Sequence, residues 1–162
     1  MARFLPAGPW SSKSGGSLEV IYSSALALPA MMAEFFDYSL EELALVQTDI
    51  RGFRLYTVTG IPKGGVGGRE FHRLRHELFF TLSGALQVCC EDMMGGRLEW
   101  VMPARHGVHI KPTILHTVTA LEPDTDFLVV ANTLFDPEDP RTHDCYSEVE
   151  FKRLKGEFIA AL

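Results

Sequence analysis

Residues 64–84 read GGVGGREFHRLRHELFFTLSG, and they carry titratable side chains at a spacing that suits two neighbouring strands. Glu70 and His72 are separated by one residue, so on a strand both side chains point to the same face. Glu77 follows at the start of an apolar run that ends at a Ser-Gly turn signal. The stretch therefore predicts consecutive strands that bring an imidazole and two carboxylates together.

A second segment, GVHIKPTILH at residues 107–116, ends on another histidine. If His116 lies on a facing strand, its side chain meets Glu70, His72 and Glu77 in the mouth of one barrel, where binding sites are common. These four side chains are the candidate functional site. The plainer alternatives are that the histidines are hydrogen-bonded core residues and that Glu77 is a charge at a strand edge.

Short strand-like runs separated by turn signals continue around these segments. They are residues 53–58, 77–82, 85–90, 98–102, 108–110, 116–121 and 127–131. Many short strands at this spacing are typical of an antiparallel sandwich or barrel. Because no helix-length segment separates the central strands, a doubly wound α/β fold is excluded. The sequence predicts an all-β, jelly-roll β-barrel of at least eight strands.

The two ends of the chain differ from this central part. Residues 1–49 are expected to form an N-terminal extension with a short strand at 18–22 and a short helix within 29–38. A second helical turn is expected after Ser39, because Glu42 follows it at the spacing of a capping box.

The remainder, residues 50–162, is expected to form the barrel with a C-terminal helix over 146–162, and the whole chain one structural domain. The apolar stripe expected on this helix consists of Val149, Leu154, Phe158 and Ile159.

The composition is that of an ordinary globular domain, with 46% hydrophobic residues and a net charge of −6. A negative net charge argues against broad binding to nucleic acid or anionic membranes. Three cysteines without regular spacing give no disulfide framework. No stretch approaches the roughly 20 apolar residues of a membrane span, and the first ten residues lack the apolar core of a signal peptide. A soluble cytoplasmic protein is the expectation.

Two further groups of charged side chains flank the candidate site. Arg69, Arg73 and Arg75 form a basic cluster, which is usually a solvated face but beside a pocket meets phosphate. The remaining histidines have no evident partner in the sequence and are expected on the surface or in loops: His76, His106, His109 and His143.

The motif spacing resembles that of the cupin superfamily. The run from Gly64 through Glu70, His72 and Glu77 to Gly84 resembles the first cupin motif, and residues 107–116 resemble the second. Glu70 stands where the superfamily has the first of two histidines. The resemblance implies a cupin jelly-roll β-barrel.

Within the cupins, residues 50–152 look most like the nucleotide-sugar 3,4-ketoisomerases, the group related to WxcM-like proteins. The matching segments are Arg54-Leu-Tyr56, Arg69-Glu-Phe-His72, Pro112-Thr-Ile-Leu-His116, Phe135-Asp136, Asp139, Asp144-Cys-Tyr146 and Phe151. The departures from that group are Glu70 for histidine, Glu77 for the usual glutamine, Arg73 for lysine and Leu115 for tryptophan.

This resemblance implies an enzyme of deoxysugar biosynthesis that interconverts 4-keto and 3-keto forms of a nucleotide-linked 6-deoxyhexose through an enediolate. It implies no cofactor, a nucleotide sugar as the small-molecule ligand and a homodimer. His72 would be the catalytic base, with Tyr56 relaying a proton or holding the enediolate oxygen. The substrate-binding residues would be Arg54, which would face the diphosphate, and Glu70, Arg73, Glu77 and His116.

Two other functions fit the same residues. In a metal-dependent cupin enzyme, Glu70, His72, Glu77 and His116 would ligate one divalent ion such as Fe, Mn, Ni or Zn. A non-catalytic sugar-binding or regulatory cupin is the third hypothesis. Two ionised carboxylates close together need a cation or a shared proton, so we expect either a bound metal or one protonated carboxyl.

Overall fold

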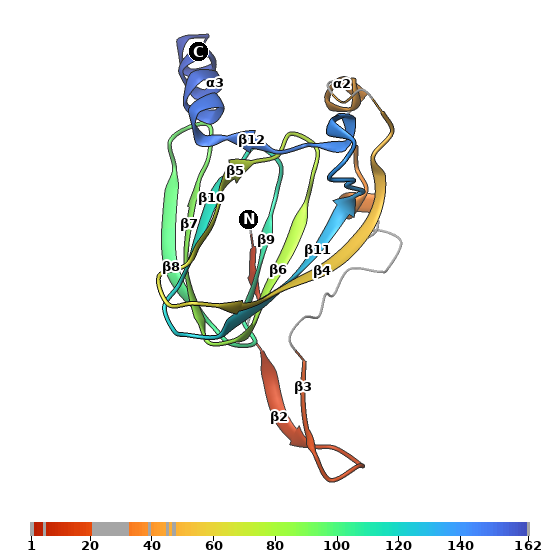
Figure 1. The fold of residues 1–162 in the computed structure, drawn as a ribbon, viewed down its shortest axis with the longest axis vertical. Helices are drawn as coiled ribbons and strands as arrows, with labels where there is room; N and C mark the ends of the chain where they lie inside the picture. The colour runs from red at the N-terminus through yellow and green to blue at the C-terminus, as the bar shows by residue number, and fades with distance from the viewer. Residues whose placement is uncertain are drawn as a thin grey trace.

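The computed structural model describes residues 2–4, 6–20, 33–38, 40–44, 46 and 48–161. Two five-stranded antiparallel sheets curve around a common interior, and a two-stranded hairpin projects away from them (Figure 1). The predicted all-β, cupin jelly-roll fold is confirmed. Within the described residues, no helix has the length and apolar character needed to cross a membrane.

The first sheet joins strands from both ends of the chain. Its order is β1 (Ala2–Phe4), β9 (Gly107–Ile110), β6 (Glu77–Ser83), β11 (Thr125–Thr133) and β4 (Arg51–Ile61). The second sheet has the order β12 (Tyr146–Ser147), β5 (Val66–Phe71), β10 (Leu115–Ala120), β7 (Ala85–Glu91) and β8 (Arg97–Pro103). The projecting hairpin is β2 (Ala7–Ser11) with β3 (Ser17–Val20), and the described residues also include α2 (Leu40–Leu43), a 3₁₀ turn (Pro140–Thr142) and α3 (Glu148–Ala160).

The barrel interior is filled by side chains that alternate along the strands. One apolar cluster takes Phe79 from β6, Val88 from β7, Met102 from β8 and Val129 from β11. Each of these side chains is at least 95% buried, and full burial of such a residue stabilises the fold by about 1.5–3 kcal/mol. Because this cluster fills one part of the interior, the polar side chains at the beginning of β6 and β10 are held in fixed positions beside it.

The N-terminal extension is part of the barrel rather than an appendage, because β1 pairs with β9. Residues 33–35 are helical, while the rest of the expected helix up to residue 32 and the expected cap Ser39 lie outside the described residues. The strand expected at 18–22 is found as β3 over residues 17–20. Residues 21 and 22 lie outside the described residues. Sequence reasoning did not predict β1 or β2, which are short and lack a clear apolar alternation.

The C-terminal helix is shorter and less embedded than expected. Tyr146 and Ser147 form a strand, and the Ser147 hydroxyl accepts a hydrogen bond from the Glu150 amide at 3.3 Å, which caps α3. The predicted apolar stripe is wrong for Val149, Phe158 and Ile159, which are 45–78% exposed. Its fourth member, Leu154, does pack against the cluster that contains the buried Phe151. Figure 1 shows the reason for the exposure: α3 stands on the end of the barrel and does not lie along a sheet.

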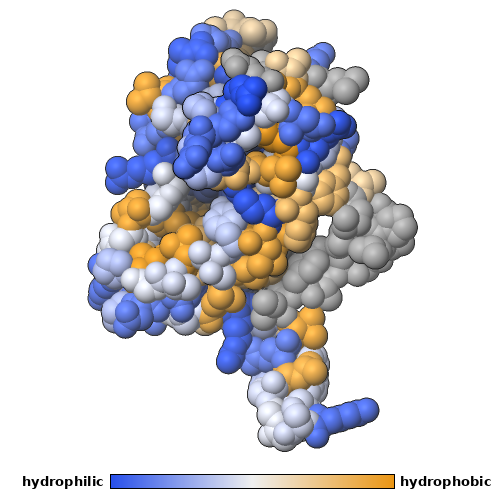
Figure 2. All heavy atoms as spheres, turned by 45° about the vertical axis from the view of Figure 1, so that its right-hand side comes forward, coloured by the Kyte–Doolittle hydropathy of each residue, from blue (hydrophilic) through white to orange (hydrophobic). Residues whose placement is uncertain are grey.

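The outward face of β4 is apolar although β4 is an edge strand. Phe53 and Leu55 are 57% and 58% exposed, and Leu134 beyond the end of β11 is also exposed. Figure 2 turns this side of the molecule forward and shows hydrophobic side chains gathered on it. A contiguous apolar surface on an edge strand is a property of surfaces that bind partners.

His76 and His109, which were expected on the surface, face each other between β6 and β9. His76 Nδ1 lies 3.0 Å from His109 Nε2, and the ring of Phe35 packs against both imidazoles. The His76 amide donates to Asn132 Oδ1, whose amide nitrogen in turn donates to the Phe35 carbonyl. Burial, followed by the charge of the neighbouring His76, lowers the pKa of His109 to about 4. The expectation of surface positions is wrong because segment 33–38 covers this face.

The His76–His109 pair predicts a loss of stability in mild acid. The pKa of His109 falls from 6.5 in the unfolded chain to about 4 in the folded chain, so the unfolded state binds more protons between these values. The free energy of unfolding is therefore highest above pH 6.5 and declines as the pH falls toward 4. Between pH 7 and pH 5 we expect a loss of roughly 1–2 kcal/mol, after allowance for solvent screening.

Urea unfolding of the wild type and of His109→Gln at the two pH values measures this loss. The variant should lose less stability than the wild type on acidification, and His143→Gln, at a half-buried surface histidine, should behave as the wild type. An equal acid loss in His109→Gln and the wild type would contradict the assignment.

Candidate functional site

Three buried side chains from three strands or strand ends meet inside the barrel. Glu77 begins β6, His116 lies in β10, and His72 follows the last residue of β5. The Nε2 atoms of His72 and His116 each lie 3.6 Å from Glu77 Oε2, and the imidazole centroids are 5.3 Å apart. The structure thus brings together the three residues that the motif spacing placed in one barrel mouth.

Glu70 joins this cluster because of a bulge between β5 and β10. Glu70 pairs with His116 and Gly68 with Thr117, which leaves Arg69 unpaired with a left-handed φ of 63°. At Gly68, with φ of 76°, a Cβ atom would lie 2.6 Å from the His116 carbonyl oxygen, so only glycine allows this approach. Glu70 Oε1 lies 4.0 Å from His72 Nε2 as a result.

Backbone carbonyls fix the same tautomer in both histidines. The carbonyl of Asp144 lies 2.5 Å from His72 Nδ1, and that of Ile114 lies 3.1 Å from His116 Nδ1. A carbonyl only accepts, so each Nδ1 carries the proton and each Nε2 presents a lone pair. The buried Nε2 of His72 has no hydrogen-bond partner among the described residues. His72 is therefore prepared to accept a proton or to bind a cation.

The side chain of Asp144 holds the loop that carries His72. Its fully buried carboxylate accepts three backbone amides at 2.8–2.9 Å, from Arg73, Leu74 and Arg75. Charge-assisted bonds of this kind are the stronger class of hydrogen bond. One residue thus positions the loop through its side chain and the imidazole of His72 through its main chain.

Glu77 stays ionised although it is buried. Burial by itself would raise the pKa of Glu77, but His72, His116 and Arg75 around it together hold the pKa well below its usual range. Arg75 Nη1 lies 3.4 Å from Glu77 Oε1, on the side of the carboxylate away from the histidines. Burial also lowers the pKa of His116, which favours its neutral form. The Nε2 atoms of the two imidazoles thus face a carboxylate oxygen, and a proton or a cation between them stabilises this arrangement.

Tyr56 and Arg54 reach the cluster from β4. The Tyr56 hydroxyl donates to Glu77 Oε1 at 3.4 Å, and burial followed by the charge of Glu77 raises the pKa of Tyr56 well above its usual value. The Arg54 guanidinium lies between two aromatic rings, 4.9 Å from the Tyr56 centroid and 5.1 Å from that of Phe135. Tyr56 therefore forms part of the wall of the site, as the strand pattern predicted.

Arg73 lies elsewhere. Its guanidinium stacks on the Tyr146 ring at 4.5 Å and pairs with Glu150 Oε1 at 3.3 Å, both near the beginning of α3. These contacts fasten the helix to the loop after His72. The structure brings Glu70, His72, Glu77, His116, Tyr56 and Arg54 together, and it turns Arg73 toward α3.

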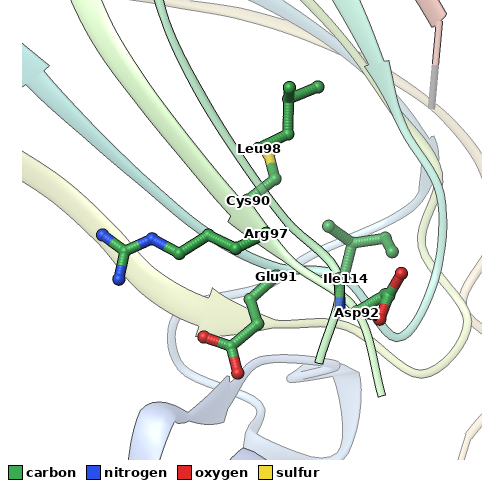
Figure 3. Close-up of a pocket in the computed structure, with 7 residues that line it drawn as sticks. Cys90, Glu91, Asp92, Arg97, Leu98 and Ile114 are labelled. Atoms are coloured by element: carbon green, nitrogen blue, oxygen red, sulfur yellow. Dashed lines mark hydrogen bonds between the residues drawn. The ribbon is translucent and has the colours of Figure 1, made fainter. Parts of the chain in front are cut away.

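A small cavity lies beside the cluster in the second sheet. Cys90 pairs with His116 on one side and with Leu98 on the other, so the three share one face. The cavity of about 240 Å³ is lined by Cys90, Glu91, Asp92, Gly96, Arg97, Leu98 and Ile114. Figure 3 shows Cys90 and Leu98 close together and the charged groups of Glu91 and Arg97 extending outward. The polar cluster thus has an apolar neighbour within the same sheet.

Sequence reasoning gave no role to two residues that shape this site, Asp144 and Cys145, and it named Arg75 only as a member of a basic cluster. The Cys145 thiol donates to Glu70 Oε2 at 2.5 Å, and burial followed by that carboxylate raises the pKa of the thiol to about 12. Asp144 and Cys145 belong to a segment that resembles the ketoisomerases. That resemblance marks the segment as important but does not indicate what either residue does. Their contacts with residues 70–75 span about seventy positions, and no local pattern reveals a contact of that range.

Comparison with known proteins identifies the family of the part of the chain that carries this site. Residues 35–151 match the family model FdtA, described as WxcM-like, C-terminal, which spans well over half of the chain. The chain belongs to this WxcM-like family. No curated protein matches the chain.

Solved structures with the fold of this WxcM-like chain include two sugar ketoisomerases. One is QdtA, a sugar 3,4-ketoisomerase from Thermoanaerobacterium thermosaccharolyticum in complex with TDP, at 15% identity, a TM-score of 0.61 and coverage of 97% of this chain and 95% of that one. The other is WlaRA, a TDP-fucose-3,4-ketoisomerase from Campylobacter jejuni, at 17% identity, a TM-score of 0.63 and coverage of 98% and 99%. At this identity the likeness supports the fold alone.

The contacts of Asp144 predict a large cost for its removal. In Asp144→Asn one amide-accepting oxygen is replaced by an NH₂ group that faces backbone donors. We expect a loss of about 2–4 kcal/mol in the free energy of unfolding, since bonds to charged groups contribute about 1.5–3 kcal/mol each.

The control is Asp126→Asn, because the Asp126 carboxylate accepts a single exposed amide, that of Gly60. Urea denaturation should show a loss below about 1 kcal/mol for that variant. Equal losses in the two variants would show that Asp144 does not hold the loop.

Proposed function

We propose that this WxcM-like protein interconverts the 4-keto and 3-keto forms of a 6-deoxyhexose linked to a nucleoside diphosphate, with no cofactor and as a homodimer. The observation that supports this most is the buried, unpartnered Nε2 of His72, whose lone pair is fixed by the hydrogen bond of Nδ1 to the Asp144 carbonyl. Family membership and the ketoisomerase fold neighbours agree with the proposal. One of these neighbours, a QdtA variant, was solved in complex with TDP-4-keto-6-deoxyglucose.

In the proposed reaction His72 Nε2 takes the proton from C3 of the sugar, beside the C4 ketone. The C3–H electron pair forms the C3–C4 double bond, and the carbonyl oxygen at C4 becomes the enediolate oxygen. In the second half of the reaction the proton of the C3 hydroxyl moves to the oxygen at C4, which becomes a hydroxyl. C4 takes its proton from the His72 imidazolium, directly or through Tyr56, and the oxygen at C3 becomes the ketone. A neutral imidazole suits both transfers near pH 7.

The residues around His72 have distinct parts in this proposal. The carboxylate of Glu77 stabilises the imidazolium that forms on His72, because its Oε2 lies 3.6 Å from Nε2. Tyr56, which remains protonated, donates a hydrogen bond to an enediolate oxygen or relays the proton to C4. Arg54 and Glu70 bind the ligand at the edge of the cluster, and His116 fixes Glu77 from the other side.

Replacement of the base tests the proposal. His72→Asn keeps approximate shape but removes the titrating nitrogen, and loss of a general base lowers the rate by about 10²–10⁴. With TDP-4-keto-6-deoxyglucose as substrate in deuterium oxide, NMR should show uptake of deuterium at C3 in the wild type and almost none in the variant.

The control is His106→Asn, because His106 Nδ1 also lies 3.0 Å from a backbone carbonyl, that of Ala104, but in the turn before β9. Its exchange rate should equal that of the wild type. Uptake that persists in His72→Asn would reject His72 as the base. If the wild type takes up no deuterium from any nucleotide-linked keto-sugar, the isomerase proposal fails and a sugar-binding function takes its place.

A second candidate function, a metal-dependent enzyme, is favoured by one specific observation. Ligand atoms of Glu70, His72 and His116 all lie within 4.8 Å of one another, and Glu77 Oε2 lies between the two imidazoles. Neutral imidazole nitrogens and carboxylate oxygens suit a divalent ion such as Fe, Mn, Ni or Zn. The ion would supply Lewis-acid stabilisation of a ligand oxygen.

Metal binding predicts a distinct set of results. The purified wild type, loaded with Zn²⁺, Mn²⁺ or Ni²⁺ and then dialysed, should retain about one ion per chain and unfold at a higher temperature, because a ligand that binds only the folded state stabilises it. His116→Asn should retain none, and His106→Asn should retain the wild-type content. Absence of retained metal in the wild type would reject this candidate.

A further inference from the structure

Two arginines lie inside the barrel at the level of Glu77. In the first sheet Ala131 of β11 pairs with Arg54 of β4 on one side and with Glu77 of β6 on the other. Residues opposite one another share a face, so Arg54 and Glu77 point into the same interior. The small side chain of Ala131 leaves space between them, and Arg75 of the loop before β6 reaches Glu77 there.

Arg75 is held tightly but incompletely. It is 5% exposed, its Nε donates to Thr133 Oγ1 at 3.0 Å, and its Nη1 contacts Glu77 Oε1 at 3.4 Å. The remaining nitrogen, Nη2, is buried and has no hydrogen-bond partner among the described residues. A guanidinium has five N–H donors, so Arg75 retains donor capacity that the protein itself does not use.

Arg54 repeats this pattern beside it. The Nε atom of Arg54 is buried and also lacks a partner in the described part of the chain. Its guanidinium lies 4.9 Å from the centroid of the Tyr56 ring and 5.1 Å from that of Phe135, and these cation–π contacts hold the group in place. The two cations share neighbours, because Arg54 lies 4.9 Å from the Tyr56 ring while the Tyr56 hydroxyl and Arg75 Nη1 both contact Glu77 Oε1 at 3.4 Å. Burial, followed by the charge of Arg75, lowers the pKa of Arg54.

Two neighbouring guanidinium groups with unused buried donors are costly unless an anion accompanies them. An unsatisfied buried donor has lost its hydrogen bonds to water without replacing them, and the cost is larger for a charged group. Planar guanidinium groups bind the paired oxygens of phosphate and carboxylate better than any other side chain. We propose that Arg54 and Arg75 form an oxyanion subsite, which binds an anionic oxygen of the ligand beside Glu77.

Under the proposed isomerase function, on which this identification of the ligand rests, the oxyanion has two possible sources. One is a phosphate oxygen of the nucleoside diphosphate, which is charged in the ground state. The other is the enediolate oxygen, which acquires its charge during the reaction. Arg75 and His72 contact opposite oxygens of the same Glu77 carboxylate, so an oxyanion on Arg75 lies close to the base.

The first experiment measures anion binding without any turnover. Calorimetric titration with inorganic pyrophosphate and with TDP compares the wild type with Arg54→Gln and Arg75→Gln. If the oxyanion is a phosphate oxygen, we expect the dissociation constants for pyrophosphate and for TDP to be at least tenfold higher in both variants. Arg51→Gln is the matched control, because Arg51 also lies in β4 but pairs with Asp49 at 2.6 Å outside the barrel.

The second experiment measures the C3 exchange rate of TDP-4-keto-6-deoxyglucose. If the oxyanion is the enediolate oxygen, the rate constant at saturating substrate falls at least tenfold in the two variants while their affinity for TDP stays at the wild-type value. A loss of affinity and a loss of rate at saturation therefore distinguish the two sources, and either loss supports the subsite.

Arg75→Gln leaves Glu77 without its cation, so its fold is checked by circular dichroism and thermal unfolding. The double variant Arg75→Gln/Glu77→Gln, which removes both charges, replaces it in the binding experiment if the single variant is unfolded.

Wild-type affinity and wild-type exchange in Arg54→Gln and in the Arg75 variant would overturn the subsite. If the wild type exchanges with no nucleotide sugar, the isomerase proposal fails, while weaker pyrophosphate binding in the variants still supports the subsite. If that binding is also unchanged, both proposals fail.

Discussion

The hydrogen bonds of Asp144 are the constraint on which the rest of the site depends. One buried carboxylate accepts the amides of three successive residues, and the carbonyl of the same residue fixes the tautomer of His72. The loop is thereby held with His72, the proposed base, at its start and the buried Arg75 at its end. Strands β5 and β6 alone would not fix the relative orientation of the His72 and Arg75 side chains, because the loop between these strands is not itself paired in a sheet.

The charges of the site are balanced in pairs around that loop. Glu77 is ionised and faces Arg75 with one oxygen and the two imidazoles with the other. Glu70 accepts a hydrogen bond from the thiol of Cys145, where Glu77 has the contact with Arg75. A cluster of this kind is stable when each carboxylate has a donor of its own, and the two lone pairs that remain, on the Nε2 atoms, are then available for chemistry.

Features that depend on residues close together in the sequence were predicted, whereas features that depend on contacts between distant segments were not. The alternation of residues in the central strands and the spacing of Glu70, His72 and Glu77 are local, so the barrel and the meeting of these side chains with His116 were predictable. The bulge at Arg69, the contacts of Asp144 and the burial of His76 join segments far apart in the chain. Val149 illustrates the opposite error, because helical periodicity reveals an apolar stripe but not whether a sheet lies against it.

Glu77, one of the departures of this chain from the ketoisomerase pattern, is coupled to Arg75. An isolated carboxylate at Glu77 would oppose the formation of an enediolate, since like charges in a buried site repel strongly. With Arg75 on its outer oxygen, Glu77 becomes a neutral pair that orients His72 and still stabilises the imidazolium. Arg54, across Ala131 in the same row, then adds positive charge where an anionic ligand needs it. Glu77 is therefore compatible with enediolate chemistry only together with Arg75, and a change of either residue alone alters the charge that the base experiences.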